Sequence, residues 1–178
     1  LGSYWEANME LIDLIPEFNL YEEYWKIYTK SDTIEPLYVS PEGHSERCMI
    51  GEGTENYGYV QNSVIGSSVK IGKGAVIRDS IIMRDAVIGD RCTIDKSIIA
   101  ENSRIGEGAV LGVGEEAPNV LNESIYSFGL VTVGEDTVIP ENVRIGKNTA
   151  ISGKTVHEDY PNGELAGGQV IIKAGDGK

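Results

Sequence analysis

Residues 63–113 decide the fold because they contain one pattern three times: SVIGSSVKIGKGAVIRD (63–79), SIIMRDAVIGDRCTIDK (80–96) and SIIAENSRIGEGAVLGV (97–113). The blocks align without a gap, and each is 17 residues long. A serine opens each block, aliphatic residues recur at spacings of six, six and five, and a glycine follows the middle aliphatic residue. Repetition at a fixed period is the sequence signature of a solenoid, in which each repeat packs on its neighbours.

The aliphatic spacing predicts a coil with three sides. It matches neither a strand, with a period of about 2 residues, nor an amphipathic helix, with a period of about 3.6. Each side is expected to be a short strand with one large aliphatic side chain pointing inward, and each corner a turn with glycine or a polar residue. Four residues after each inward aliphatic, a mostly small inward residue is expected: Val69, Ala75, Ile81, Ala86, Cys92, Ile98, Ser103 and Ala109. The predicted fold is an all-β solenoid, a parallel β-helix. Ile88→Asp would be strongly destabilising, because it would place an unpaired carboxylate in the interior.

The rest of the chain divides into three expected regions. The β-helix is predicted over 46–155, and a break in the pattern predicts a loop excursion at about 114–129. Residues 1–45 are expected to form a short helix, capped by Ser3 and ended by Pro16, and then a linker. Residues 156–178 are expected to form a loop and a short strand, Gln169 to Lys173. Trp5, Met9 and Ile12 are expected on one face of the helix. The aromatic residues that follow suggest a segment packed against another body, or one that covers the open end of the solenoid: Phe18, Tyr21, Tyr24, Trp25 and Tyr28.

Composition excludes several classes of function. The net charge is −13, from 28 acidic and 15 basic residues, so nucleic acid and anionic membrane surfaces are poor partners. No apolar run approaches the roughly 18 residues that a spanning helix needs. Two cysteines do not suggest a disulfide framework and favour a reducing, cytoplasmic location. Since the chain begins at Leu1 and leads directly into a helical pattern, we expect it to be part of a longer protein.

The hexads and their flanks resemble known proteins. Hexads of the form Ile-Gly-x-x-Ala/Ser/Val are similar to those of the left-handed β-helix superfamily, and this resemblance implies the left-handed coil. The flanks resemble bacterial glucose-1-phosphate adenylyltransferase, also called ADP-glucose pyrophosphorylase, over essentially the whole chain. The stretches that carry this resemblance are SYWEANMEL (3–11), PEFNLY (16–21), WKIYT (25–29), NSVIG (62–66), VIPE (138–141) and IIKAG (171–175).

The resemblance implies a role for the chain within a larger enzyme. Members make ADP-glucose and pyrophosphate from ATP and glucose 1-phosphate for glycogen synthesis, on a preceding catalytic domain that holds Mg²⁺. No glycine-rich nucleotide loop is found in this chain, so we expect it to have no catalytic residue, cofactor or metal site and to be inactive alone. The expected role is regulation and oligomerisation, with its own catalytic domain and a homotetramer as partners.

The same resemblance suggests an effector site for a sugar phosphate or a related anion. Lys173 is the best match to the basic residues that some members use near the C-terminus, and Lys154 and Lys147 are weaker matches. For each of them, an ordinary solvated lysine is the alternative. Arginines that other members place in the last segment are missing after Arg144.

Two other classes of function stay open. A hexapeptide acyltransferase would need a catalytic histidine at a coil interface, but His44 and His157 are expected outside the regular coils. Two histidines also cannot supply three zinc ligands. A purely structural β-helix scaffold is the remaining alternative. Cys92 is expected to be a buried structural thiol.

Overall fold

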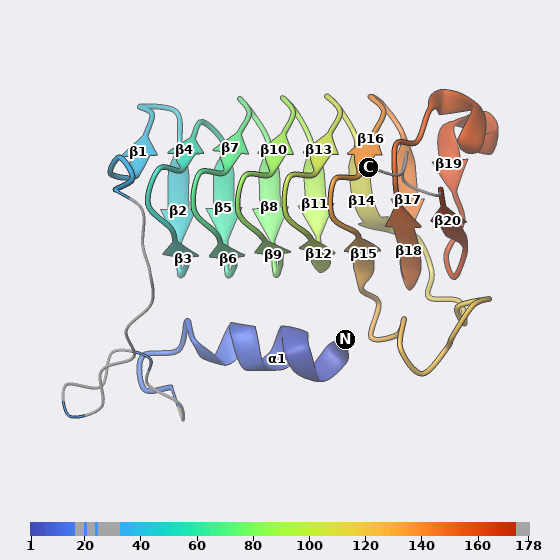
Figure 1. The fold of residues 1–178 in the computed structure, drawn as a ribbon, viewed down its shortest axis with the longest axis horizontal. Helices are drawn as coiled ribbons and strands as arrows, with labels where there is room; N and C mark the ends of the chain where they lie inside the picture. Colours follow the sequence, from blue (N-terminus) through green and yellow to red (C-terminus); the bar gives the residue numbers. More distant parts are fainter. Residues whose placement is uncertain (17–19, 21–23, 25–32, 174–178) are drawn as a thin grey trace.

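A solenoid of parallel strands forms the body of the molecule (Figure 1). The computed structural model describes residues 1–16, 20, 24 and 33–173. Successive strands of the chain belong to three different sheets, and the strands that pair with one another lie one coil apart. This arrangement confirms the predicted parallel β-helix with coils of about 17 residues.

The three sheets, here named A, B and C, contain six, seven and seven strands. The strands of sheet A are β1 (Tyr38–Val39), β4 (Glu55–Asn56), β7 (Lys70–Ile71), β10 (Val87–Ile88), β13 (Arg104–Ile105) and β16 (Val138–Ile139). Those of sheet B are β2 (His44–Glu46), β5 (Tyr59–Gln61), β8 (Val76–Arg78), β11 (Thr93–Asp95), β14 (Val110–Val113), β17 (Arg144–Gly146) and β19 (Glu164–Leu165). Those of sheet C are β3 (Met49–Ile50), β6 (Val64–Ile65), β9 (Ile81–Ile82), β12 (Ser97–Ile99), β15 (Val131–Val133), β18 (Thr149–Ser152) and β20 (Val170–Ile172).

The core is a stack of aliphatic side chains along the axis of the solenoid. In sheet A, Ile88 pairs with Ile71 on one side and with Ile105 on the other, so identical side chains lie directly above one another. All three are buried, and burying each contributes roughly 2–3 kcal/mol before entropy is counted. The large inward residues in sheets B and C follow the same register: Val60, Ile77, Ile94, Leu111, Ile145, Ile65, Ile82, Ile99, Val133 and Ile151.

A ladder of serines forms the corner between sheets B and C. The hydroxyl of Ser63 accepts the backbone N–H of Ser80 at 3.2 Å, and the hydroxyl of Ser80 accepts that of Ser97 at 3.1 Å. Each hydroxyl also donates to the carbonyl two residues earlier. Because these hydroxyls are fully buried, the bonds are needed to compensate for lost hydration. The serine that opens every repeat is thus a corner residue.

The short side of each coil turns Ile81 and Ile98 outward, and the prediction that they point into the shaft is wrong. A side of five residues brings Ser80 and Ser97 to the buried corner, so the next residue faces away from the axis. Ile81 and Ile98 form a separate buried cluster with Leu130, outside the main core. The other predicted small positions, which include Val69, Ala86 and Cys92, are buried in the shaft.

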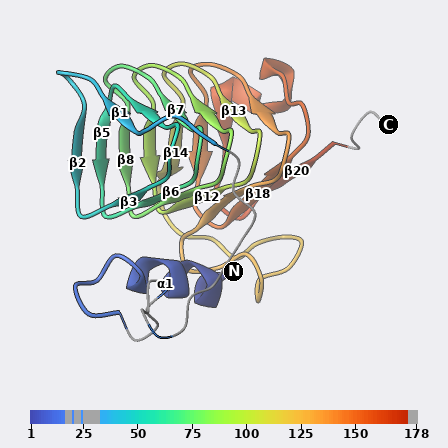
Figure 2. The same cartoon turned by 60° about the vertical axis from the view of Figure 1, so that its left-hand side comes forward.

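One helix covers this outward cluster. Helix α1 (Gly2–Glu10) lies along the face formed by sheet C, as two views show (Figure 1 and Figure 2). Trp5 and Met9 are four residues apart, so they lie on one face of α1, and both pack against the cluster. The predicted capping by Ser3 is wrong, because Leu1 is the N-cap and Ser3 lies inside the helix. The helix also ends at Glu10, well before Pro16.

The paired strands extend beyond the expected range of 46–155 at both ends. Sheet A begins at Tyr38, and sheet C ends at Ile172, within the predicted strand at Gln169 to Lys173. At the first end, buried Asn56 occupies the inward position that Ile71 occupies in the next coil. At the last end, two short 3₁₀ helices, η1 (His157–Asp159) and η2 (Pro161–Gly163), follow β18. Of the predicted aromatic contacts, Tyr24 is exposed, whereas Phe18, Tyr21, Trp25 and Tyr28 lie outside the described residues.

Candidate functional site

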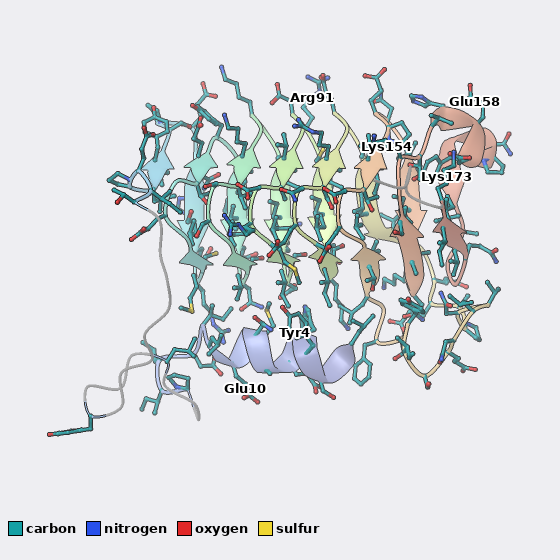
Figure 3. The ribbon with its side chains drawn as sticks, viewed as in Figure 1. Tyr4, Glu10, Arg91, Lys154, Glu158 and Lys173 are labelled. Carbon is teal, nitrogen blue, oxygen red and sulfur yellow. The ribbon has the colours of Figure 1, made fainter. Side chains whose placement is uncertain are left out.

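Two of the three predicted effector lysines, Lys154 and Lys173, lie side by side. Lys154 follows β18, and its backbone forms an isolated parallel β-bridge with Val138. The backbone N–H of Lys173 donates to the carbonyl of Ser152 at 2.9 Å. Gly153 lies between them, where a Cβ atom would come within 2.7 Å of the Lys173 carbonyl oxygen. Figure 3 shows both lysines at the C-terminal end of the solenoid. The last coils therefore bring two basic side chains to one edge.

The charge of Lys173 is partly compensated by a neighbouring acid. Its ammonium lies 2.5 Å from Oδ2 of Asp159, and the same oxygen accepts the backbone N–H of Val156 at 2.8 Å. The hydrogen bond from Lys173 and that from Val156 lower the pKa of the Asp159 carboxyl. Lys154 is exposed. An anion at this edge would therefore meet Lys154 directly and would compete with Asp159 for Lys173.

Lys147 belongs to a different corner. It lies at the other end of β18 from Lys154, and its backbone carbonyl accepts the N–H of Gly168 at 2.8 Å. Its side chain is near Gly129 in the loop at 114–129. The structure thus separates Lys147 from the other two predicted lysines.

The charge of Lys147 influences a half-buried acid, Asp95. Desolvation and the charge of Asp79 raise the pKa of Asp95 on β11, while Lys147 and Arg78 act in the opposite direction. Asp95 is half-buried, so its carboxylate is only partly hydrated. The charge of Lys147 therefore favours the ionised form of Asp95.

Polar contacts hold the loop at 114–129 to the solenoid. No strand lies between β14 and β15 in this part of the described chain. Buried Asn148 accepts the N–H of Gly129 at 2.7 Å and donates to the carbonyl of Ala117 at 3.0 Å, so it bonds both ends of the loop. The Asn119 side chain donates to the Asn148 carbonyl at 2.7 Å. The repeat pattern did not predict this anchor, because the partners of Asn148 lie 19 and 31 residues away along the chain.

Contacts across the outward face of sheet C attach α1 to the solenoid. The indole N–H of Trp5 donates to the carbonyl of Asp79 at 2.7 Å, and the Lys96 ammonium lies 5.5 Å from the centroid of the Trp5 ring system. Both partners occupy corners that precede the serine ladder, and both have positive φ. The repeat pattern does not predict this contact, although the doubled isoleucines of the sequence Ser-Ile-Ile indicate an outward apolar face.

The histidines do not form a catalytic arrangement with one another. His44 lies on β2, a strand of the solenoid that precedes the regular coils at 63–113. Its ring stacks on Tyr59 at a centroid distance of 5.4 Å. His157 lies on η1, where Nε2 is 2.9 Å from the Glu141 carbonyl oxygen. Within residues 1–16, 20, 24 and 33–173, no group of three or more His, Cys, Asp or Glu side chains could hold a metal ion.

The thiol of Cys92 is buried. Its side chain lies in the shaft, and desolvation raises its pKa to about 11. The thiol is close to the carbonyl oxygen of Gly106, at 3.0 Å. The prediction of a buried structural thiol is confirmed.

A small cavity of about 150 Å³ lies between the start of the loop and the last coil. It is lined by Glu115, Arg144 and Glu164, among others, and by none of the three predicted lysines. Nε of Arg144 lies 3.2 Å from Oε1 of Glu164, so the charge of the arginine is already compensated.

Among the helices of the described residues, none has the length and apolar character needed to cross a membrane.

Comparison with known proteins identifies relatives of the chain. Residues 39–116 match the family described as EIF2B subunit epsilon LbH domain. The chain is 66% identical over 176 residues to the glucose-1-phosphate adenylyltransferase of Lachnospira eligens. The aligned region covers 99% of this chain and 42% of that protein. The protein of the same name from Thermotoga neapolitana is 46% identical over 172 residues, covering 97% and 41%. The chain thus spans less than half the length of these curated relatives.

Solved structures with similar coils are more distant. The acetyltransferase domain of PglB from Neisseria gonorrhoeae superposes with a TM-score of 0.44 and 17% sequence identity, over 74% of this chain and 55% of that chain. A likeness at this level carries no argument about the activity of this chain.

Proposed function

Since the chain is homologous to the C-terminal part of glucose-1-phosphate adenylyltransferases, we propose that it is the regulatory and oligomerisation domain of such an enzyme. The observation that carries the proposal is the identity of 66% over 99% of the chain, which includes α1 and the loop at 114–129 as well as the coils. Coils alone occur with many activities, so the matching flanks support the proposal more strongly than the repeat does.

The reaction proposed for the longer protein is the formation of ADP-glucose and pyrophosphate from ATP and glucose 1-phosphate, for glycogen synthesis in the cytoplasm. Its catalytic residues, and those that hold Mg²⁺, would belong to a domain that precedes Leu1. The chain alone is expected to be inactive and to support a homotetramer in the longer protein.

The proposed effector site is the edge formed by Lys154 and Lys173. Their proximity and the exposure of Lys154 support the binding of a sugar phosphate or a related anion. The third predicted residue, Lys147, would act only indirectly, through the corner that holds the loop. Asp159 reduces the attraction of this edge for anions, because its carboxylate already pairs with Lys173.

The test of the proposed reaction uses the longer protein that continues upstream of Leu1. Pyrophosphate release is measured with ATP and glucose 1-phosphate, and in parallel with GTP and mannose 1-phosphate. Activity with the ATP pair alone supports the proposal. Inactivity with both pairs contradicts it and favours a structural scaffold or an acyltransferase. The 178-residue chain serves as the control and should release no pyrophosphate.

The effector site is tested by its lysines. In the longer protein, Lys173→Ala and Lys154→Ala should each weaken the response of the activity to inorganic phosphate and to a sugar bisphosphate, by about five- to tenfold in half-saturating concentration. Lys73→Ala is the matched control, since Lys73 is an exposed corner lysine away from the last coils. An equal change in all three variants would contradict the site, because it would indicate only a general effect of charge.

A further inference from the structure

The loop excursion exposes a group of large apolar side chains. Val120, Leu121, Ile125 and Phe128, here called the loop patch, are 67%, 57%, 44% and 52% exposed. Single exposed apolar residues are ordinary on protein surfaces, but four within one short loop are not. Another run of exposed apolar residues, Leu37 to Val39, lies at the opposite end of the solenoid, at β1.

Polar anchors hold the loop patch in place. The Asn119 side chain accepts the backbone N–H of Leu121 at 2.9 Å, and the N–H of Val120 donates to the Gly168 carbonyl at 2.9 Å. Asn148 bonds the two ends of the loop, as described above. An apolar surface that is fixed before binding loses little conformational entropy when a partner covers it. The anchors therefore favour a binding surface over a loose excursion.

The loop patch lies beside the start of the chain. Gly2 is buried, and a Cβ atom there would lie 2.5 Å from the ring of Phe128, so α1 begins in contact with the loop. Figure 1 and Figure 2 both show the N-terminus next to the loop. The curated relatives are more than twice as long as this chain, which matches their C-terminal part. The preceding part of a longer protein would therefore leave the solenoid at this point.

We propose that the loop patch is the docking surface for the domain that precedes Leu1 in the longer protein, and that it takes an apolar surface of that domain. The inference rests on the proposed function, because that function places a domain upstream. The same loop bonds to Asn148, the neighbour of Lys147, so docking would connect the last coils to the preceding domain. A second copy of the chain is the competing occupant, and the experiment distinguishes it.

The test compares side-chain accessibility in the longer protein with that in the 178-residue chain, by hydroxyl-radical footprinting. Leu121 and Ile125 should be modified about fivefold less in the longer protein, because a domain interface excludes water from its centre. Val156, 48% exposed on the segment after β18, is the matched control and should be modified equally in both. Equal modification of the loop patch in the two proteins would overturn the proposal. Protection in the 178-residue chain that increases with its concentration would also overturn it, in favour of a second copy.

A pair of variants tests the contact energetically. Leu121→Asp should increase the modification of Phe128 in the longer protein and should leave the melting temperature of the 178-residue chain unchanged, because Leu121 is exposed there. Val156→Asp should do neither. If the two variants behave alike in the longer protein, the loop patch is not a docking surface. Pyrophosphate release by the unmodified longer protein separates the two proposals: protection without activity contradicts only the proposed reaction, and activity without protection contradicts only the docking surface.

Discussion

Two adjacent isoleucines on β9 test which side chains point into the shaft of the solenoid and which point outward toward α1. Ile81 and Ile82 are both buried, but Ile82 belongs to the shaft and Ile81 to the cluster beneath α1. We consider Ile81→Ala, Ile82→Ala and Trp5→Ala, alone and in pairs. Only the pair of Ile81 and Trp5 should be coupled, because only these two residues belong to the same cluster.

The expected magnitudes follow from the groups removed. Truncating isoleucine to alanine removes three carbons from a buried site, about 2.4 kcal/mol of transfer free energy at roughly 0.8 kcal/mol each. In the shaft, where Ile82 lies between Ile65 and Ile99, a residual cavity raises the loss of unfolding free energy to about 3–4 kcal/mol. Ile81→Ala should cost somewhat less, about 2–3 kcal/mol, because a helix at the surface can move into the gap.

The assay is urea unfolding of the 178-residue chain, monitored by circular dichroism. The coupling energy of Ile81→Ala with Trp5→Ala should be about 1 kcal/mol, and that of Ile82→Ala with Trp5→Ala should be within about 0.3 kcal/mol of zero. A coupling of Ile82 with Trp5 as large as that of Ile81 would refute the assignment of the two faces. Zero coupling for both pairs would refute the packing of α1 on sheet C.

Three further predictions concern single residues. Asn148→Ala should increase deuterium uptake in the loop at 114–129 and lower the unfolding free energy by about 1–3 kcal/mol, because it leaves buried backbone groups unbonded; unchanged uptake would contradict the anchor. Burial raises the pKa of Asp95, so the stability that its protonated form contributes is present below the unfolded pKa and is lost as pH rises through the folded pKa. Asp95→Asn should therefore raise the melting temperature at pH 7 more than at pH 3, and a larger gain at acidic pH would show the sign to be wrong. At pH 8, a maleimide should modify native Cys92 much more slowly than half-buried Cys48, as measured by mass spectrometry, because the pKa of Cys92 is about 11; equal rates would contradict its burial.

The repeat by itself determined the path of the main chain. A period of 17 residues with inward aliphatics allows only one register, because a slip of one residue would turn Ile71, Ile88 and Ile105 to the surface together. The break after Val113 likewise predicted the loop, since its residues provide no inward aliphatic at the required spacing. The burial of Cys92 followed from its place in the same pattern.

Only the tertiary structure decided what lies on the outside of the coils. Whether Ile81 is covered depends on α1, and the bond between Trp5 and Asp79 joins residues 74 positions apart, a contact that no local pattern encodes. The same holds for the lysines. Lys154 and Lys173 meet because two successive coils stack, whereas Lys147, closer to Lys154 in sequence, turns toward the loop at another corner. A repeat specifies its interior because every coil must fill the same shaft, but its outer residues face whatever segment the rest of the chain brings there.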